Sequence, residues 1–160
     1  MFVIGERING MFTTIGDAIL AKDPTPIRAM AESQIAAGAN ALDINVGTRV
    51  PKAERPAVMK WLVDSTREVT NICLAIDTPS LEVMRIGLEA ASRKGPGMIN
   101  STTGQADKLA AFMKLAAEFN AGIVGLAIDE NGVAATCDAK VEIGMRTIAA
   151  AAEVNISPED

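Results

Sequence analysis

The sequence predicts an α/β fold made of five consecutive strand–helix units. Two observations carry this prediction: short apolar segments that end near Asp or Asn recur along the chain, and an amphipathic segment follows each of them. These apolar runs are typical of strands that are buried on both faces of a parallel sheet. Their starts lie roughly 25 to 38 residues apart, the length that a strand, a helix and their loops require. The expected strands are Phe2–Ile4, Ala39–Val46, Ile72–Ile76, Gly97–Ile99 and Ile123–Ile128.

The segments between the strands carry signals that start and stop helices. Thr25 before Pro26 predicts an N-cap and a first helical position, and Gly38 follows the end of that helix. Pro56 opens the next helix, and Ser80 is placed to cap the third. The helices expected from these signals and from apolar residues at helical spacing are 26–37, 57–69, 81–93, 105–119 and about 139–154.

Five strand–helix units in this order are compatible with two architectures, an open doubly wound sheet or part of an eight-stranded barrel. A complete barrel takes roughly 250 residues, whereas the chain has 160. Five barrel units alone would leave two parallel strand edges unpaired, which folded proteins avoid. If the fold is a barrel, we therefore expect a fragment or one half of a two-part barrel, with the closing strands absent from the sequence.

The composition narrows the classes of function. The chain is 49% hydrophobic, which is enough for one domain with a core. It has no histidine, the commonest general base and zinc ligand, and Cys73 and Cys137 form no metal or redox motif. A net charge of −5 without basic clusters argues against nucleic acid. Because neither a signal peptide nor a long apolar run is present, we expect a cytoplasmic protein with no membrane contact.

Polar side chains end every expected strand. Functional groups of parallel α/β proteins collect at the carboxyl ends of the strands. Asp43 and Asn45 lie two residues apart on one strand and therefore share a face. The other candidates at strand ends are Glu6, Asn9, Asp77, Asn100, Asp129 and Glu130. Carboxylates and amides in such number suit a flat ligand rich in N–H donors, because a carboxylate accepts two parallel hydrogen bonds. Carboxylates are also ligands for hard metal ions.

Four strand ends resemble, in order and spacing, those of the methyltetrahydrofolate:corrinoid (iron–sulfur) protein methyltransferases. The matching segments are Ile4–Gly10, Ala41–Gly47, Ile76–Thr78 and Met98–Thr102. The folate domain of cobalamin-dependent methionine synthase is similar too. The resemblance covers essentially the whole chain and implies a pterin-binding (β/α)8 TIM-type barrel. Residues 1–160 would then form the N-terminal portion of a single barrel domain, with about the first five βα units.

The resemblance also implies roles for individual residues. The positions that match the family's pterin site are Glu6, Asn9, Asp43, Asn45, Asp77 and Asn100. Among them, Asp77 and Asn100 match the pair that hydrogen-bonds the pterin ring, and the others line or support the pocket. The family's asparagine beside the methyl-bearing nitrogen would lie beyond residue 160, so no catalytic residue is assigned, although Asn100 would contribute. Purely structural roles, such as loop capping by Asn9, are the alternative. Arg7 is expected to be an ion-pair partner rather than a ligand residue.

The activity implied is methyl transfer between N5 of (methyl)tetrahydrofolate and the cobalt of a separate corrinoid protein. Tetrahydrofolate would be the substrate, the partner protein would carry the cobalamin, and the family usually forms homodimers. Three alternatives stay open: a dihydropteroate synthase-like enzyme, a pterin-binding fragment without activity, and a barrel enzyme with a carboxylate-bound metal. The segment Asp43–Gly47 has the methyltransferase form and differs from the Asp-x-Gly-x-x-Ser-Thr form of dihydropteroate synthase. The sequence does not choose the direction of transfer.

Overall fold

The computed structural model describes residues 1–157 of the chain. Its centre is a five-stranded parallel sheet whose strands follow one another in chain order. The strands are β1 Ile4–Asn9, β2 Ala41–Asn45, β3 Cys73–Asp77, β4 Gly97–Thr103 and β5 Gly122–Leu126. Neighbours in sequence that are also neighbours in the sheet, joined by helices on one side, are the arrangement of barrel-type βα units. The predicted succession of five strand–helix units is thus confirmed.

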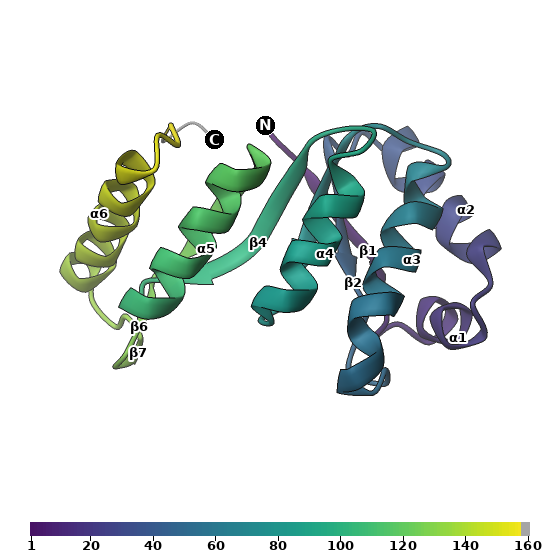
Figure 1. Cartoon of the computed structure of the whole chain (residues 1–160), viewed down its shortest axis with the longest axis horizontal. Helices are drawn as coiled ribbons and strands as arrows, with labels where there is room; N and C mark the ends of the chain where they lie inside the picture. Colours follow the sequence, from purple (N-terminus) through teal and green to yellow (C-terminus); the bar gives the residue numbers. More distant parts are fainter. Residues whose placement is uncertain (158–160) are drawn as a thin grey trace.

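The helices form one layer along the sheet, and α2 to α6 lie side by side in chain order (Figure 1). They are α1 Thr13–Ala21, α2 Pro24–Ala36, α3 Arg55–Arg67, α4 Leu81–Ala91, α5 Ala106–Phe119 and α6 Cys137–Glu153, with a short 3-10 turn, η1, at Lys52–Glu54. Ser80 caps α4 as expected, since its Oγ accepts a hydrogen bond from the backbone N–H of Val83 at 3.4 Å. No helix within residues 1–157 combines the length and hydropathy that crossing a membrane requires.

Three expectations about the N-terminal third were wrong. The first strand is Ile4–Asn9 rather than Phe2–Ile4, because Glu6 and Arg7, which interrupt the apolar pattern, continue the strand through a bulge. The 9-residue helix α1 was not predicted. The cap of α2 is Asp23, whose carboxylate accepts from the N–H of Thr25 at 2.9 Å, so that Pro24, rather than Pro26, opens the helix.

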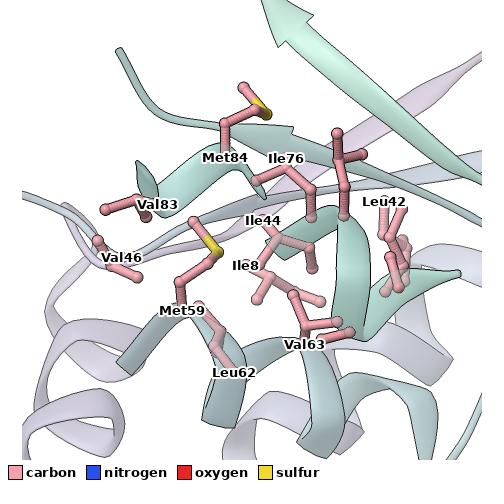
Figure 2. Close-up of a cluster of buried hydrophobic side chains, with 14 of the residues drawn as sticks. Ile8, Leu42, Ile44, Val46, Met59, Leu62, Val63, Ile76, Val83 and Met84 are labelled. Atoms are coloured by element: carbon pink, nitrogen blue, oxygen red, sulfur yellow. The ribbon is translucent and has the colours of Figure 1, made fainter. Parts of the chain in front are cut away.

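The main core lies between the sheet and the helices. Ile8, Ile44 and Ile76 point from three neighbouring strands toward Met59 and other apolar side chains of α3 and α4 (Figure 2). Because side chains alternate along a strand, the residues next to these isoleucines face away from the helices. Burial of the isoleucines therefore decides which polar side chains reach the opposite face of the sheet.

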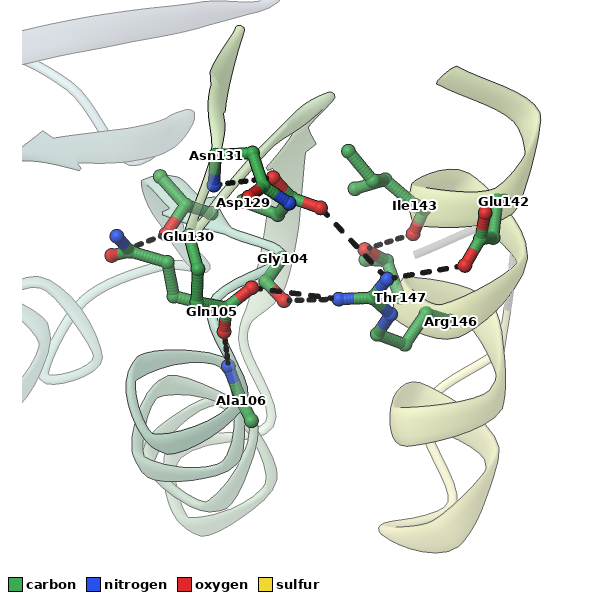
Figure 3. Close-up of polar contacts among 11 residues, drawn as sticks. Gly104, Gln105, Ala106, Asp129, Glu130, Asn131, Glu142, Ile143, Arg146 and Thr147 are labelled. Carbon is green, nitrogen blue, oxygen red and sulfur yellow. Dashed lines mark hydrogen bonds and ion pairs between the residues drawn. The ribbon is translucent and has the colours of Figure 1, made fainter. Parts of the chain in front are cut away.

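The C-terminal part carries a small hairpin that the sequence did not predict. The expected strand Ile123–Ile128 is divided into β5 and β6 Ile128–Asp129, and β6 pairs antiparallel with β7 Gly132–Val133. Glu130 in the hairpin turn accepts a hydrogen bond from the N–H of Ala106 at 3.0 Å, at the start of α5. Arg146 of α6 donates to the carbonyl of Gly104 at 3.2 Å (Figure 3). Arg146 also forms ion pairs with Asp129 and Glu130 at 3.9 and 3.8 Å, so the hairpin contacts both helices.

Candidate functional site

Side chains from three neighbouring strands meet in two hydrogen-bonded pairs on the face of the sheet away from the helices. Asn45 Nδ2 of β2 donates to Asp77 Oδ2 of β3 at 2.6 Å. Asn100 Nδ2 of β4 donates to Asp43 Oδ1 of β2 at 2.8 Å, reaching past β3. In the sheet, Asp77 lies directly beside Asn100. Four of the residues that the sequence placed at strand ends therefore form one cluster.

The loops after β1 and β2 fix the orientation of Asn45. Its Oδ1 accepts a hydrogen bond from the N–H of Gly47 at 2.7 Å, so its Nδ2 faces Asp77. Gly47 has a φ of +75°, and a Cβ there would lie 2.6 Å from the carbonyl carbon of Gly10. Only glycine is free of both the conformational and the steric cost at this position. The motif after β2 thus provides a turn that presents the Asn45 amide.

Glu6 and Asn9 on β1 take different positions at the cluster. Asn9 pairs with Asn45 in the sheet, but its Oδ1 accepts from the N–H of Met11 at 2.9 Å and so holds the following loop. Glu6 is exposed, and its negative charge is felt by both carboxyl groups of the cluster. Glu6 therefore acts on the two pairs through its charge. The side chain of Asn9 instead makes the loop-capping hydrogen bond that was the structural alternative for this residue.

Arg7 is not the ion-pair partner that we expected. Within residues 1–157 it has no carboxylate within salt-bridge distance, and its guanidinium instead stacks over the ring of Phe12 at 4.3 Å from the centroid. Its backbone N–H donates to Gln34 Oε1 of α2 at 2.9 Å. Gln34, which sequence reasoning missed, stands seven positions after Ile27 on the buried face of α2, where an apolar residue is the rule.

Burial raises the pKa values of the two aspartates in the cluster. Burial, with smaller contributions from the charges of Asp77 and Glu6, raises the pKa of Asp43 to about 7 against the opposing effect of the hydrogen bond from Asn100. The pKa of Asp77 is also raised, first by burial and then by Glu6, against the hydrogen bond from Asn45. The charged groups acting on both carboxyls are negative. Such a cluster favours a ligand that brings N–H donors.

A cavity and the acidic residues of the C-terminal hairpin lie apart from this cluster. No group of three or more His, Cys, Asp or Glu side chains in residues 1–157 is arranged to hold a metal ion. A cavity of about 650 Å³ is lined by residues at the starts of the strands, such as Cys73, Gly97 and Gly122, at the opposite end of the sheet. Asp129 and Glu130 belong to the hairpin network around Arg146.

Comparison with known proteins gives consistent relatives. The chain is 31% identical over 160 residues to the methylcorrinoid:tetrahydrofolate methyltransferase of Eubacterium limosum, covering 99% of this chain and 58% of that protein. It is 31% identical over 154 residues to a methionine synthase of Mycobacterium leprae, covering 92% of this chain and 12% of the synthase. The methionine synthase of Mycobacterium tuberculosis is 32% identical over 154 residues, with 92% and 13% covered.

A solved structure has the same fold. The 7,8-dihydropteroate synthase of Vibrio fischeri ES114 superposes with a TM-score of 0.64 at 20% identity, covering 99% of this chain and 58% of the other. The described strands and helices therefore form part of a TIM-type barrel, and the chain spans 58% of the length of the Eubacterium protein. The sequence matches the pterin binding enzyme family over residues 6–160, and the chain belongs to that family.

Proposed function

We propose that the chain binds the pterin of tetrahydrofolate for methyl transfer between N5 of the folate and the cobalt of a corrinoid held by a separate protein. The observation that carries the proposal is the pair Asp77 and Asn100, which lie side by side on β3 and β4. Relatives named as a methylcorrinoid:tetrahydrofolate methyltransferase and as methionine synthases support this chemistry over other pterin reactions.

The composition of the cluster fits a pterin. One edge of that ring presents adjacent N–H and NH₂ donors, and a carboxylate accepts both in parallel. Asp77 uses one oxygen for Asn45 and keeps the other, while Asn100 keeps its carbonyl oxygen and a second N–H. In the proposed pterin site, Asp77 and Asn100 contact the ring, and the residues that line or support the site are Glu6, Asn9, Asp43 and Asn45.

The role of these residues in the reaction would be to bind and orient the pterin. Cleavage of the bond between N5 and its methyl group leaves a poor leaving group unless the nitrogen receives a proton or a strong hydrogen bond. The partner's corrinoid would supply the metal that takes or gives the methyl group. Fixing the ring by Asp77 and Asn100 would set the direction in which N5 faces that partner.

The proposal extends to assembly and location. We place the protein in the cytoplasm, as the composition favours, with a corrinoid protein as its partner. Val141, Met145 and Ile148 share one face of α6 and are exposed, so a homodimer that covers this face would remove apolar surface from water. Light scattering of the purified protein reports whether it is dimeric, and a monomer at micromolar concentration would contradict this part of the proposal.

The test of the function is calorimetric titration with tetrahydrofolate. The wild-type chain should bind saturably, and Asp77→Ala and Asn100→Ala should each lose at least about tenfold in affinity, since each removes a hydrogen bond to the ring. Asp64→Ala is the control, because Asp64 lies on α3 and pairs with Lys60. Binding should be followed by methyl transfer to or from a corrinoid protein. A folded wild-type chain that does not bind tetrahydrofolate would overturn the proposal.

A further inference from the structure

The two hydrogen bonds of the polar cluster have the same donor and acceptor types. In each pair an asparagine donates to an aspartate on a different strand: Asn45 to Asp77, and Asn100 to Asp43. One member of each pair is on β2, and the other is on β3 or β4. Each pair therefore joins a residue of β2 to a residue of β3 or β4.

The β2 member of the second pair is inaccessible to a ligand. Asp43 is only 2% exposed, whereas its partner Asn100 is partly exposed. Asp43 also lies beside Ala75 in the sheet, two residues before Asp77. A molecule that lies on the ends of the strands would meet Asn100 first, with Asp43 behind it.

The β2 member of the first pair has its amide engaged at both ends. The N–H of Gly47 occupies its oxygen, and Asp77 occupies its nitrogen. Because the oxygen of Asn45 faces a backbone donor, rotation of the amide by 180° would oppose two donors and two acceptors. Asn45 therefore transmits the fixed position of the Gly47 turn to the carboxylate of Asp77.

We propose that Asp43 and Asn45 are positioning residues, which set the orientation of Asn100 and Asp77 and do not themselves contact the pterin. This inference rests on the proposed function and refines it. It divides the residues that the sequence grouped together: Asp77 and Asn100 touch the ring, and the β2 pair acts through them. Asn45 selects which oxygen of Asp77 is free, and Asp43 selects which hydrogen of the Asn100 amide is free.

The first test uses Asn45→Asp, with tetrahydrofolate as the probe in calorimetry between pH 6 and pH 8. The new carboxylate still accepts from Gly47 but faces Asp77, so the two acids must share a proton. The affinity relative to wild type should be at least about tenfold lower at pH 8 and should recover toward pH 6, where the shared proton restores a donor to Asp77. If the ratio of the affinity of Asn45→Asp to that of wild type does not change with pH, the proposed role of Asn45 is overturned.

Asn40→Asp is the matched control for this variant. Asn40 lies just before the other end of β2, where its Oδ1 accepts from the N–H of Val3 at 2.8 Å, and the substitution adds the same charge. Its affinity should stay within about twofold of wild type across the pH range, because screening weakens the effect of a distant exposed charge. A pH dependence equal to that of Asn45→Asp would show that net charge, rather than contact with Asp77, is responsible, and would overturn the inference.

The second test compares Asp43→Asn with Asp43→Leu. The asparagine keeps an oxygen that accepts from Asn100 Nδ2, whereas leucine does not. Asp43→Asn should bind tetrahydrofolate within about threefold of wild type, and Asp43→Leu should bind at least about tenfold more weakly. If the leucine variant does not fold, Asp43→Asn still decides, since a tenfold loss in that folded variant would overturn positioning by Asp43.

Failure of the proposed function and failure of the positioning role give different binding results. Absence of tetrahydrofolate binding by the wild-type chain would overturn the proposed function and this inference with it. Loss of binding in Asp77→Ala would support the pterin site. If, in addition, the relative affinity of Asn45→Asp does not change with pH, or Asp43→Asn loses binding, only the positioning role is overturned and the pterin site remains.

Discussion

Asn45 donates a hydrogen bond of 2.6 Å to Asp77, a residue 32 positions later on the adjacent strand. This contact exists because the parallel pairing of β2 with β3 places Ile44 beside Ile76, so that the next residue of each strand extends toward the same edge. The isoleucines turn toward the helices, and the polar residues therefore turn to the other face. The geometry of the candidate site is a direct consequence of how the core is packed.

Asp77→Asn keeps the shape of the side chain but removes its charge, so it should affect tetrahydrofolate binding much more than stability. Asn45 Nδ2 can still donate to the new amide oxygen, so the free energy of unfolding should change by less than about 1 kcal/mol. The affinity for tetrahydrofolate should fall roughly tenfold to a hundredfold, because the carboxylate that accepts two ring donors is lost. Calorimetry and thermal unfolding of the same preparation check both statements, and unchanged affinity would contradict the assignment of Asp77 as a ring contact.

Stability should depend on pH through Asp43. Burial raises the pKa of this carboxyl from 3.8 to about 7 in the folded chain, so the folded state holds its proton more tightly than the unfolded state does. The contribution of Asp43 to the free energy of unfolding is therefore most favourable below pH 3.8. It is lost as the pH rises through about 7, and the loss is on the order of a few kcal/mol. The free energy of unfolding of Asp43→Asn, relative to wild type, should therefore increase between pH 5 and pH 8. A constant difference would contradict the raised pKa.

Gly47→Ala should destabilise the chain more than an alanine at another glycine of positive φ. At Gly47 the added Cβ meets the backbone of Gly10 at 2.6 Å, in addition to the strain of a φ of +75°. Gly38 is the matched control, because its φ is +96° and a Cβ there would meet nothing within 4 Å. We expect a loss of about 1 kcal/mol for Gly38→Ala and at least about 2 kcal/mol for Gly47→Ala in urea unfolding. Equal losses would show that the contact with Gly10 relaxes without cost.

Arg67 should be indispensable for the end of the sheet opposite the candidate site. This residue of α3 is 4% exposed and donates to three backbone carbonyls, those of Ile72, Ala91 and Pro96, at 2.5, 3.0 and 2.8 Å. Burial lowers its pKa. Arg67→Met should cost about 3 kcal/mol or more, because it leaves buried acceptors unpaired.

Arg93→Met is the control for Arg67→Met. Arg93 is exposed and forms an i,i+4 ion pair with Glu89 at 3.2 Å, so its loss should cost less than about 0.5 kcal/mol. Urea unfolding of both variants checks the difference. Similar costs would mean that the three carbonyls find other donors.

The sequence by itself determined the succession of strands and helices. Apolar runs such as Leu74–Ile76 are buried wherever a parallel sheet lies under helices, so their hydrophobicity is enough to identify them. It also located the polar residues at the strand ends, since strand periodicity and the direction of the chain follow from local pattern alone. The family followed from the same residues and is confirmed over residues 6–160.

Tertiary structure alone decided what those polar residues do to one another. Whether Asn100 bonds Asp43 or its neighbour Asp77 depends on the sheet register and on burial, and both arise from packing of residues far apart in sequence. The same holds for the polar residues that continue β1 beyond Gly5 and for Arg7, which stacks on Phe12 rather than pairing with a carboxylate. The local sequence pattern predicts which side chain stands at a strand end. The hydrogen-bond partner of that side chain, its solvation and hence its pKa are set by the elements that surround it.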